Sequence, residues 1–221
     1  MITAVIFDMD GTLIDSVDLH AASWQRTFTQ FGFQIDFTAI RSQIGKGGDQ
    51  LMPVFLSEEE VDRLGADMEQ FRKHLFQQEC LPKVRGFAGV PDLFRRILTD
   101  DKRTAIASSA KQDELASFEE IAGVRGLVSE KTSSDDAQRS KPFPDIFQAA
   151  LKRLAIPADQ AVVIGDSPHD AEAAGAAGIV TIGLLCGGFP EADLRRAGCA
   201  EIYRDPKDLL RNYDLSLLGR R

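Results

Sequence analysis

The sequence predicts an α/β fold in which a doubly wound parallel sheet carries a small inserted helical unit. Short apolar segments rich in Val, Ile and Ala recur along the chain, a pattern typical of strands that are buried on both faces. Amphipathic segments separate them, and several have a proline near their first turn, where this residue is favoured. A stretch of about 70 residues near the N-terminus is the exception, because it shows helical periodicity and almost no strand signal.

Strands and helices alternate outside that stretch, which predicts a parallel sheet with helices packed on it. The expected strands are residues 4–7, 104–107, 127–129, 161–165 and 179–184. The expected helices between them are residues 91–98, 112–121, 144–154 and 168–177.

The helical stretch predicts a separate unit inserted after the first strand. Its apolar positions gather on two helix faces, one with Trp24, Phe28 and Phe31 and the other with Leu64, Met68, Phe71, Leu75 and Phe76. At roughly 150 residues per domain, a chain of 221 residues corresponds to about one and a half domains. We therefore expect a Rossmann-like sheet domain of residues 1–15 and 87–221, and a small helical domain of residues 16–86.

The acidic charge balance excludes several classes of partner. The chain has 26 Lys and Arg against 34 Asp and Glu, which gives a formal net charge of −8. Surfaces that bind nucleic acid or anionic membranes need an excess of Lys and Arg. We expect a small-molecule partner, no nucleic acid or membrane partner, and a monomer or weak homodimer.

The cysteines and apolar segments favour the cytoplasm. Cys80, Cys186 and Cys199 are too few and too scattered for a disulfide framework or a thiolate metal site, which fits a reducing compartment. The N-terminal segment lacks a basic region and is interrupted by acidic residues, so we do not expect a secretory signal. The uncharged run at residues 173–190 contains five glycines, which argues against a membrane helix.

Two aspartates follow the first predicted strand. Asp8 and Asp10 are two residues apart, so their side chains point the same way, toward the place where doubly wound sheets bind ligands. Gly11 permits a tight turn that brings backbone N–H groups toward that place. Two carboxylates so close repel each other, which raises one pKa or recruits a cation. A turn or cap role for these residues is the alternative interpretation.

A second acidic cluster follows the predicted strand at residues 161–165. If the two strands are neighbours, Asp166 converges with the first pair of aspartates, and such hard oxygen ligands suit Mg²⁺. Asp170 has two interpretations. It is an outer metal ligand or a support for the site, or it is the partner of Ser167 in a capping box that begins a helix.

Two further polar segments lie at loops of the predicted sheet. Lys141 is fixed in a proline-rich loop directly before a helix, where its charge can offset negative charge at the sheet edge. Ser108 and Ser109 follow another strand, where a hydroxyl can donate to a phosphoryl oxygen. A solvated loop lysine and ordinary turn serines are the alternatives.

These segments, taken in order, resemble the four motifs of the haloacid dehalogenase superfamily of phosphohydrolases. The residues that carry the resemblance are Asp8-Met9-Asp10-Gly11-Thr12, then Ser108, then Lys141-Pro142, then Gly165-Asp166-Ser167 with Asp170. The resemblance covers nearly the whole chain. The helical unit is similar to the family's small helical cap, as in its phosphoglycolate phosphatase and β-phosphoglucomutase relatives.

The resemblance implies a role for each motif residue. Asp8 is implied as the nucleophile that forms an aspartyl-phosphate, and Asp10 as the acid and base that protonates the leaving oxygen and then activates water. Mg²⁺ is implied as the cofactor, held by Asp8, Asp166 and the backbone carbonyl of Asp10, with Asp170 as a further candidate. Ser108 and Lys141 complete the implied catalytic set, and the implied phosphate-binding residues are Gly11, Thr12 and Ser109.

The resemblance also assigns substrate choice to the helical cap. His20 lies four residues before Trp24, where the family's histidine positions substrate or stabilises closure; a partly buried helix residue is the alternative. Lys46 lies in a glycine-rich segment and is a candidate to bind a distal anionic group, although the segment also fits a plain turn. Mutase-like caps carry an arginine where this chain has Gly48, which weakens a mutase interpretation without excluding it, since Lys46 is available as a substitute.

The leading hypothesis from sequence is a Mg²⁺-dependent phosphatase that hydrolyses a small phosphate monoester, either a sugar phosphate or a phosphoglycolate-like acid. A β-phosphoglucomutase-like phosphomutase is the second enzyme hypothesis. A catalytically weak binding or regulatory protein on the same fold is the third, and the intact motif set argues against it.

Overall fold

A six-stranded parallel sheet forms the centre of the computed structural model, which describes residues 1–220 apart from the side chains of residues 112 and 113. The strands are β1 (Ala4–Phe7), β4 (Arg103–Ala107), β5 (Glu130–Thr132), β6 (Ala161–Gly165), β7 (Val180–Leu184) and β8 (Cys199–Tyr203). Their order is β5-β4-β1-β6-β7-β8, so the N-terminal strand lies in the middle. Phe7 of β1 is paired with Ile106 on one side and with Ile164 on the other.

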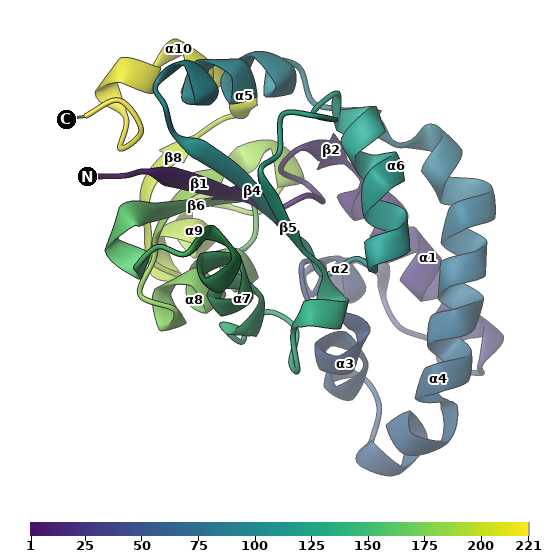
Figure 1. Cartoon of the computed structure of the whole chain (residues 1–221). Helices are drawn as coiled ribbons and strands as arrows, with labels where there is room; N and C mark the ends of the chain where they lie inside the picture. The colour runs from purple at the N-terminus through teal and green to yellow at the C-terminus, as the bar shows by residue number, and fades with distance from the viewer. Residues whose placement is uncertain (221) are drawn as a thin grey trace.

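Helices cover both faces of this sheet. They are α5 (Val90–Thr99), α6 (Gln112–Ala122), α7 (Asp145–Leu154), α8 (Pro168–Ala176), α9 (Glu191–Arg196) and α10 (Pro206–Arg211). In Figure 1, α5 and α10 lie on one side of the sheet, and α7, α8 and α9 lie on the other. Val5 and Phe7 face the core beneath α5, whereas Ala4 and Ile6 face the core beneath α7 and α8, because strand side chains alternate.

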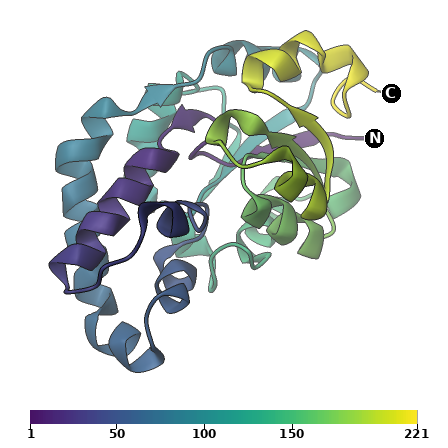
Figure 2. The ribbon, with the colours of Figure 1, turned by 180° about the vertical axis from the view of Figure 1, so that it is seen from behind.

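A second apolar core lies in the helical insert, the segment of residues 16–86 between the first strand and α5. The helical elements of the insert are α1 (Val17–Gln30), α2 (Phe37–Arg41), α3 (Gly48–Leu51), α4 (Glu58–Leu75) and a π-helical turn (Phe76–Cys80). Trp24, Phe28 and Met68 are central to this core. Figure 2 shows the insert to one side of the sheet.

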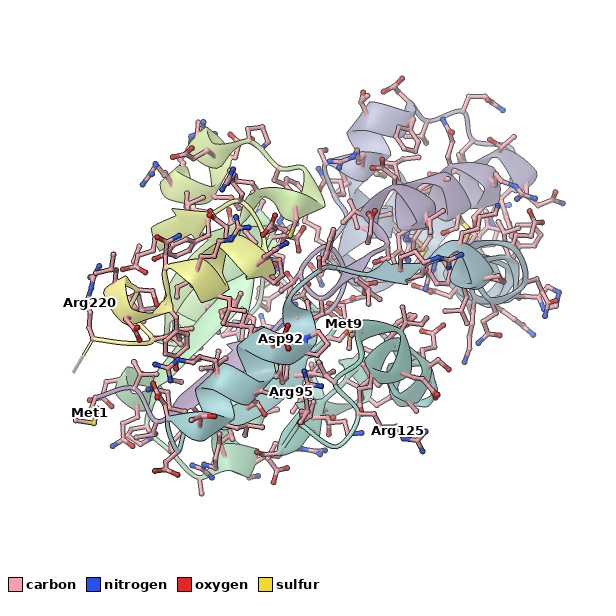
Figure 3. All side chains as sticks on the ribbon, turned by 90° about the horizontal axis from the view of Figure 1, so that it is seen from above. Met1, Met9, Asp92, Arg95, Arg125 and Arg220 are labelled. Atoms are coloured by element: carbon pink, nitrogen blue, oxygen red, sulfur yellow. The ribbon has the colours of Figure 1, made fainter. Side chains whose placement is uncertain are left out.

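The chain enters and leaves the insert through two short paired strands. β2 (Ile14–Asp15) and β3 (Arg85–Gly86) are antiparallel, and Ile14 is opposite Gly86. Met1 and Arg220 lie together at the opposite end of the sheet (Figure 3). The carboxyl ends of the strands therefore face the insert (Figure 1). Within residues 1–220, no helix combines the length and apolarity that crossing a bilayer requires.

The predicted doubly wound sheet is confirmed, and one strand was placed wrongly. Each of the other four predicted strands, and each predicted helix, ends within one residue of its observed counterpart. The strand expected at residues 127–129 is part of a turn, and β5 begins at Glu130. The apolar Leu127 and Val128 pack against the core from this turn, so their character reflects burial and not strand pairing. The prediction also lacked the edge strand β8, which is only partly buried and contains a glutamate.

Candidate active site

The carboxyl ends of the two central strands bring three carboxylates together. Asp8 directly follows β1, and Asp166 directly follows β6. The register of these strands places Asp166 one residue beyond the position opposite Asp8. Asp170 comes from the first turn of α8. All three are buried, and each offers an oxygen within 4.8 Å of the other two. The convergence expected from sequence therefore exists, and its hard oxygen donors fit a divalent cation.

Asp170 forms the capping box that its sequence position allows, and it also lies among the buried carboxylates. Its Oδ2 accepts hydrogen bonds from the Ser167 backbone N–H at 3.1 Å and from the Ser167 hydroxyl at 2.7 Å. Its backbone N–H donates to the Ser167 hydroxyl at 3.3 Å, which completes a capping box. Its Oδ1 faces the carboxylate cluster and lies 2.7 Å from the Lys141 ammonium. The helix cap therefore fixes the orientation of a carboxylate that belongs to the site.

Lys141 is the cation among these carboxylates. It is fully buried, it forms ion pairs with Asp8 and Asp170, and it donates to the Ala107 carbonyl oxygen at 3.2 Å. The alternative of a solvated loop lysine is therefore wrong. Ser108, which follows Ala107 at the end of β4, is also fully buried, and its hydroxyl accepts the backbone N–H two residues further on.

The cluster carries an excess of buried negative charge. Burial raises the pKa of Asp8 to about 7, and the neighbouring Asp170 adds to the rise. Burial, Asp170 and Asp8 also raise the pKa of Asp166 well above its usual range. Burial by itself lowers the pKa of Lys141, but the charges of Asp170 and Asp8 outweigh burial and raise that pKa. One ammonium does not balance three carboxylates, and a divalent cation neutralises such an excess.

The Asp10 carboxylate lies outside this cluster and is held by helix α1. Its Oδ1 accepts a hydrogen bond from the Ser16 hydroxyl at 2.6 Å and lies 2.9 Å from His20 Nε2. Burial by itself raises the pKa of Asp10, but the charge of His20 and the hydrogen bonds from His20 and Ser16 outweigh it and lower that pKa. Any metal contact of Asp10 therefore depends on its backbone carbonyl, as the resemblance implied.

His20 is both a packed helix residue and a partner of the site. Its ring stacks on Phe76 of the π-helical turn, with centroids 4.1 Å apart and planes 5° from parallel. Its Nδ1 lies 3.5 Å from Nη1 of Arg72, whose guanidinium lies over the Trp24 ring. His20 is therefore a partly buried helix residue that contacts Asp10, and its role toward the substrate stays a prediction. Arg72 was not predicted, because a charged residue on a polar helix carries no local sign that it faces a cleft.

Thr12 supports Asp166, and Gly11 lies in the same turn. The Thr12 hydroxyl is buried and donates to Asp166 Oδ1 at 2.9 Å. The Gly11 N–H donates to the Ile14 carbonyl, and the Gly11 carbonyl accepts from the Cys186 thiol at 3.2 Å. The Thr12 hydroxyl thus holds a carboxylate, and the Gly11 backbone groups bond to Ile14 and Cys186. Substrate binding by Gly11 and Thr12 stays a prediction.

A side chain at position 11 is expected to disrupt the carboxylate cluster. Gly11 has φ +80°, and an added Cβ would strike the Asp166 carboxylate. We expect Gly11→Ala to lower the free energy of unfolding by more than about 1 kcal/mol, measured by denaturant unfolding. Gly32→Ala is the matched control, because Gly32 has φ +91° with open space around it. Equal losses in the two variants would show that backbone strain alone is responsible.

A cleft of about 1190 Å³ lies between the carboxylates and the helical insert. Asp8 and Asp10 line it on the sheet side. Three residues predicted to bind substrate, His20, Lys46 and Ser109, also line it. Lys46 Nζ donates to Gln43 Oε1 at 2.6 Å, so part of its hydrogen-bonding capacity is used within the insert.

The segment of residues 41–49 fixes the insert over the site. It is hydrogen-bonded to four segments beside the sheet. Arg41 donates to the Gly187 carbonyl at 2.9 Å and to the Gly188 carbonyl at 3.4 Å, and His169 Nε2 lies 3.2 Å from the Ser42 carbonyl. Ser109 Oγ donates to the Gly45 carbonyl at 3.4 Å, and the Ser140 N–H donates to Asp49 Oδ2 at 3.0 Å. Ser109, Ser140 and His169 each adjoin a motif residue, and Gly187 lies against the Asp166 carboxylate. The Cys186-Gly187-Gly188 loop, to which the sequence assigned no role, thus belongs to this contact.

Fold and site together define a class of enzyme. In this class, buried carboxylates at the carboxyl ends of parallel strands face a cleft that a helical insert covers. Within that class, the chain belongs to the haloacid dehalogenase-like hydrolase family, whose family model matches residues 5–184. The resemblance inferred from the motifs is confirmed.

Relatives of known name agree with this assignment. Protein SUPPRESSOR OF QUENCHING 1, chloroplastic, of Arabidopsis thaliana is 31% identical over 208 residues, which cover 92% of this chain and 20% of that protein. Validoxylamine A 7'-phosphate phosphatase of Streptomyces hygroscopicus subsp. limoneus is 26% identical, with 83% of this chain and 86% of that enzyme covered. The crystal structure of a hydrolase from Pseudomonas syringae superposes with a TM-score of 0.85 at 29% identity, over 96% of this chain and 98% of that one. The chain thus spans a fifth of the plant protein and most of the bacterial proteins.

Proposed function

We propose that the chain is a Mg²⁺-dependent phosphatase that hydrolyses phosphate monoesters through an aspartyl-phosphate on Asp8. Membership of the hydrolase family and the similarity to a named phosphatase support phosphate-ester hydrolysis. The observation that carries the proposal is the placement of Asp8. It is a buried carboxylate at the end of the central strand, paired with Lys141, beside Asp166 and Asp170, and at the wall of the cleft.

Asp8 supplies the attacking oxygen in this mechanism. Its carboxylate attacks phosphorus, the bond from phosphorus to the leaving oxygen breaks, and the phosphoryl group remains on Asp8. Water then attacks the same phosphorus, which restores the carboxylate and releases inorganic phosphate. Lys141 is paired with Asp8, and Ser108 directly follows the neighbouring strand β4. Both are buried beside Asp8, where they stabilise the charge of the phosphoryl oxygens.

Asp10 transfers the proton in both steps. In the first step it protonates the leaving oxygen, and in the second it accepts a proton from the attacking water. The lowered pKa of Asp10 keeps its carboxylate ionised near neutral pH, which suits the second role. For the first role Asp10 must first gain a proton, and His20 Nε2, 2.9 Å from Asp10 Oδ1, is a group that can exchange a proton with it.

Asp8, Asp166 and Asp170 would hold Mg²⁺, with the backbone carbonyl of Asp10 as an additional ligand. The bound ion supplies neutralisation of the negative charge on the phosphate. Hydrogen bonds from Thr12 to Asp166 and from Ser167 to Asp170 orient these carboxylates before the ion binds.

We also propose that the chain divides into a sheet domain of residues 1–15 and 87–221 and a cap of residues 16–86. The pairing of β2 with β3 at these limits supports the division. The separate apolar core of the insert supports it as well. In this arrangement the contacts of residues 41–49 represent the closed state of the cap.

Removal of divalent cations is expected to abolish activity and to lower thermal stability. A ligand present at 100 times its dissociation constant stabilises the folded state by about 2.7 kcal/mol. We expect Mg²⁺ to raise the melting temperature of the chelator-treated protein, and we expect Asp166→Asn to lose this increase. The measurements are thermal unfolding and turnover of p-nitrophenyl phosphate, each with and without chelator. Full activity in excess chelator would contradict the role given to the metal.

A further inference from the structure

The cleft has room for a leaving group much larger than a phosphate. Its volume of about 1190 Å³ exceeds the roughly 300–1,000 Å³ that is usual for small-molecule sites. A water molecule takes about 30 Å³ of liquid, so a phosphate and its cation fill only a small part of this space. The insert contributes an apolar wall there that includes Trp24, Met52, Val61 and Ala66. We call this surface the cap wall.

Charged groups around the cap wall balance one another. Apart from Asp8 and Asp10, the described residues lining the cleft include four acids and four bases, namely Asp49, Glu69, Glu114 and Asp135 with Lys46, Arg72, Lys73 and Lys111. Arg72 Nε lies 3.6 Å from Glu69, and Lys111 Nζ lies 3.2 Å from Asp135. Burial also lowers the pKa of Lys46. These described residues therefore provide no excess of positive charge for a second anion.

Glu69 occupies the space that a side chain at position 48 would fill. A Cβ added to Gly48 would strike Glu69 Oε1 and would lie 3.3 Å from the Trp24 ring. The absence of a side chain at Gly48 therefore leaves the space in the cap wall that the Glu69 carboxylate occupies. Together they place a carboxylate, next to Arg72 and Trp24, at the part of the cleft lined by the insert.

We infer that the substrate's leaving group is a large, uncharged, polyhydroxylated ring, and that Glu69 selects against a second anionic group. This inference rests on the proposed phosphatase function and narrows its substrate class. Such a ring places its C–H faces on the apolar wall, while its hydroxyls donate to Glu69 and accept from Arg72. A second phosphate or a carboxylate would face the Glu69 carboxylate, and like charges placed together reject that ligand.

Two substrates that differ in one phosphate test the inference. We expect kcat/KM for a hexose 6-phosphate to exceed that for the corresponding 1,6-bisphosphate by about tenfold or more. On the Asp8→Asn protein, which holds the ligand without turnover, we expect the monophosphate to bind with the lower Kd. The only tryptophan of the chain, Trp24, lies in the cap wall, so its fluorescence reports binding there. Equal or better use of the bisphosphate would overturn the inference.

Glu69→Gln is the variant that tests the selecting residue. We expect it to bring the kcat/KM ratio of the two substrates close to one, and turnover of p-nitrophenyl phosphate by the variant establishes that its reacting groups are intact. Asp67→Asn on the same helix is the matched control, because it removes the same charge from an exposed position outside the cleft lining and should leave the ratio unaltered. A ratio that stays the same in Glu69→Gln contradicts the role of Glu69. Absence of turnover of every ester, including p-nitrophenyl phosphate, contradicts the phosphatase function instead.

Discussion

Replacing Asp8 with Asn is expected to abolish turnover of phosphate esters while the fold stays intact. The amide is not a nucleophile toward phosphorus, so no covalent intermediate forms. Loss of the nucleophile from a concerted catalytic unit commonly costs about 10⁴-fold or more in kcat, and we expect a loss of that size on p-nitrophenyl phosphate. Stability should be retained or increased, because the substitution removes one of three mutually repelling buried carboxylates and leaves Lys141 paired with Asp170.

The control for this variant is a substitution of the same kind away from the cleft. Asp159 is exposed on the sheet domain, and Asp159→Asn should retain wild-type kcat. Circular dichroism and thermal unfolding of both variants establish that each is folded. Substantial turnover by a folded Asp8→Asn protein would exclude the covalent mechanism.

Replacing Asp10 with Asn is expected to separate the two chemical steps. A nitrophenolate leaves without protonation, so Asn at position 10 permits transfer of the phosphoryl group from p-nitrophenyl phosphate to Asp8. The second step still lacks its base, and general base catalysis contributes roughly 10²- to 10⁴-fold. We therefore expect a burst of one equivalent of nitrophenolate per active site, followed by slow turnover. With an alkyl phosphate, whose leaving group needs a proton, both burst and turnover should be lost.

Rapid-mixing absorbance measurements check this result, and Ser16→Ala provides a milder comparison. Ser16 donates to Asp10 and has no role as an acid or base, so its loss should alter the position of Asp10 but preserve steady turnover without a burst. Slow turnover of the Asp10 variant on the aryl ester with no burst would mean that Asp10 is not the base of the second step.

The sheet was predictable because its strands carry local signals. β1 and β6 are short, wholly apolar and followed by Asp8 and Asp166, so both their length and their ends can be found in one sequence. Burial without hydrogen-bond pairing gives the same apolar signal, which is why Leu127 and Val128 were taken for a strand. The partly exposed β8 gives too weak a signal to be found.

The site was predictable to the extent that strand ends converge. Asp8, Asp166 and Lys141 follow from strand and loop positions together with the motif resemblance. The surroundings of Asp10 and the cap wall do not, because they depend on which face of a helix meets the sheet domain. In the sequence, Arg72 and Glu69 are ordinary polar residues of α4. Only the folded insert shows that both side chains line the cleft.

The proposed mechanism passes through a phosphoryl group that is covalently bound to Asp8. Rapid quenching followed by mass spectrometry detects this intermediate. The Asp10→Asn protein reacts with p-nitrophenyl phosphate in the presence of Mg²⁺ and is quenched in acid during slow turnover. The masses of the intact protein and of its peptides are then measured. We expect one added phosphoryl group per chain, located at Asp8 in the peptide that contains β1, and none in the Asp8→Asn, Asp10→Asn double variant. A phosphoryl group on any other residue, or hydrolysis with no phosphorylated protein at any quench time, would contradict it.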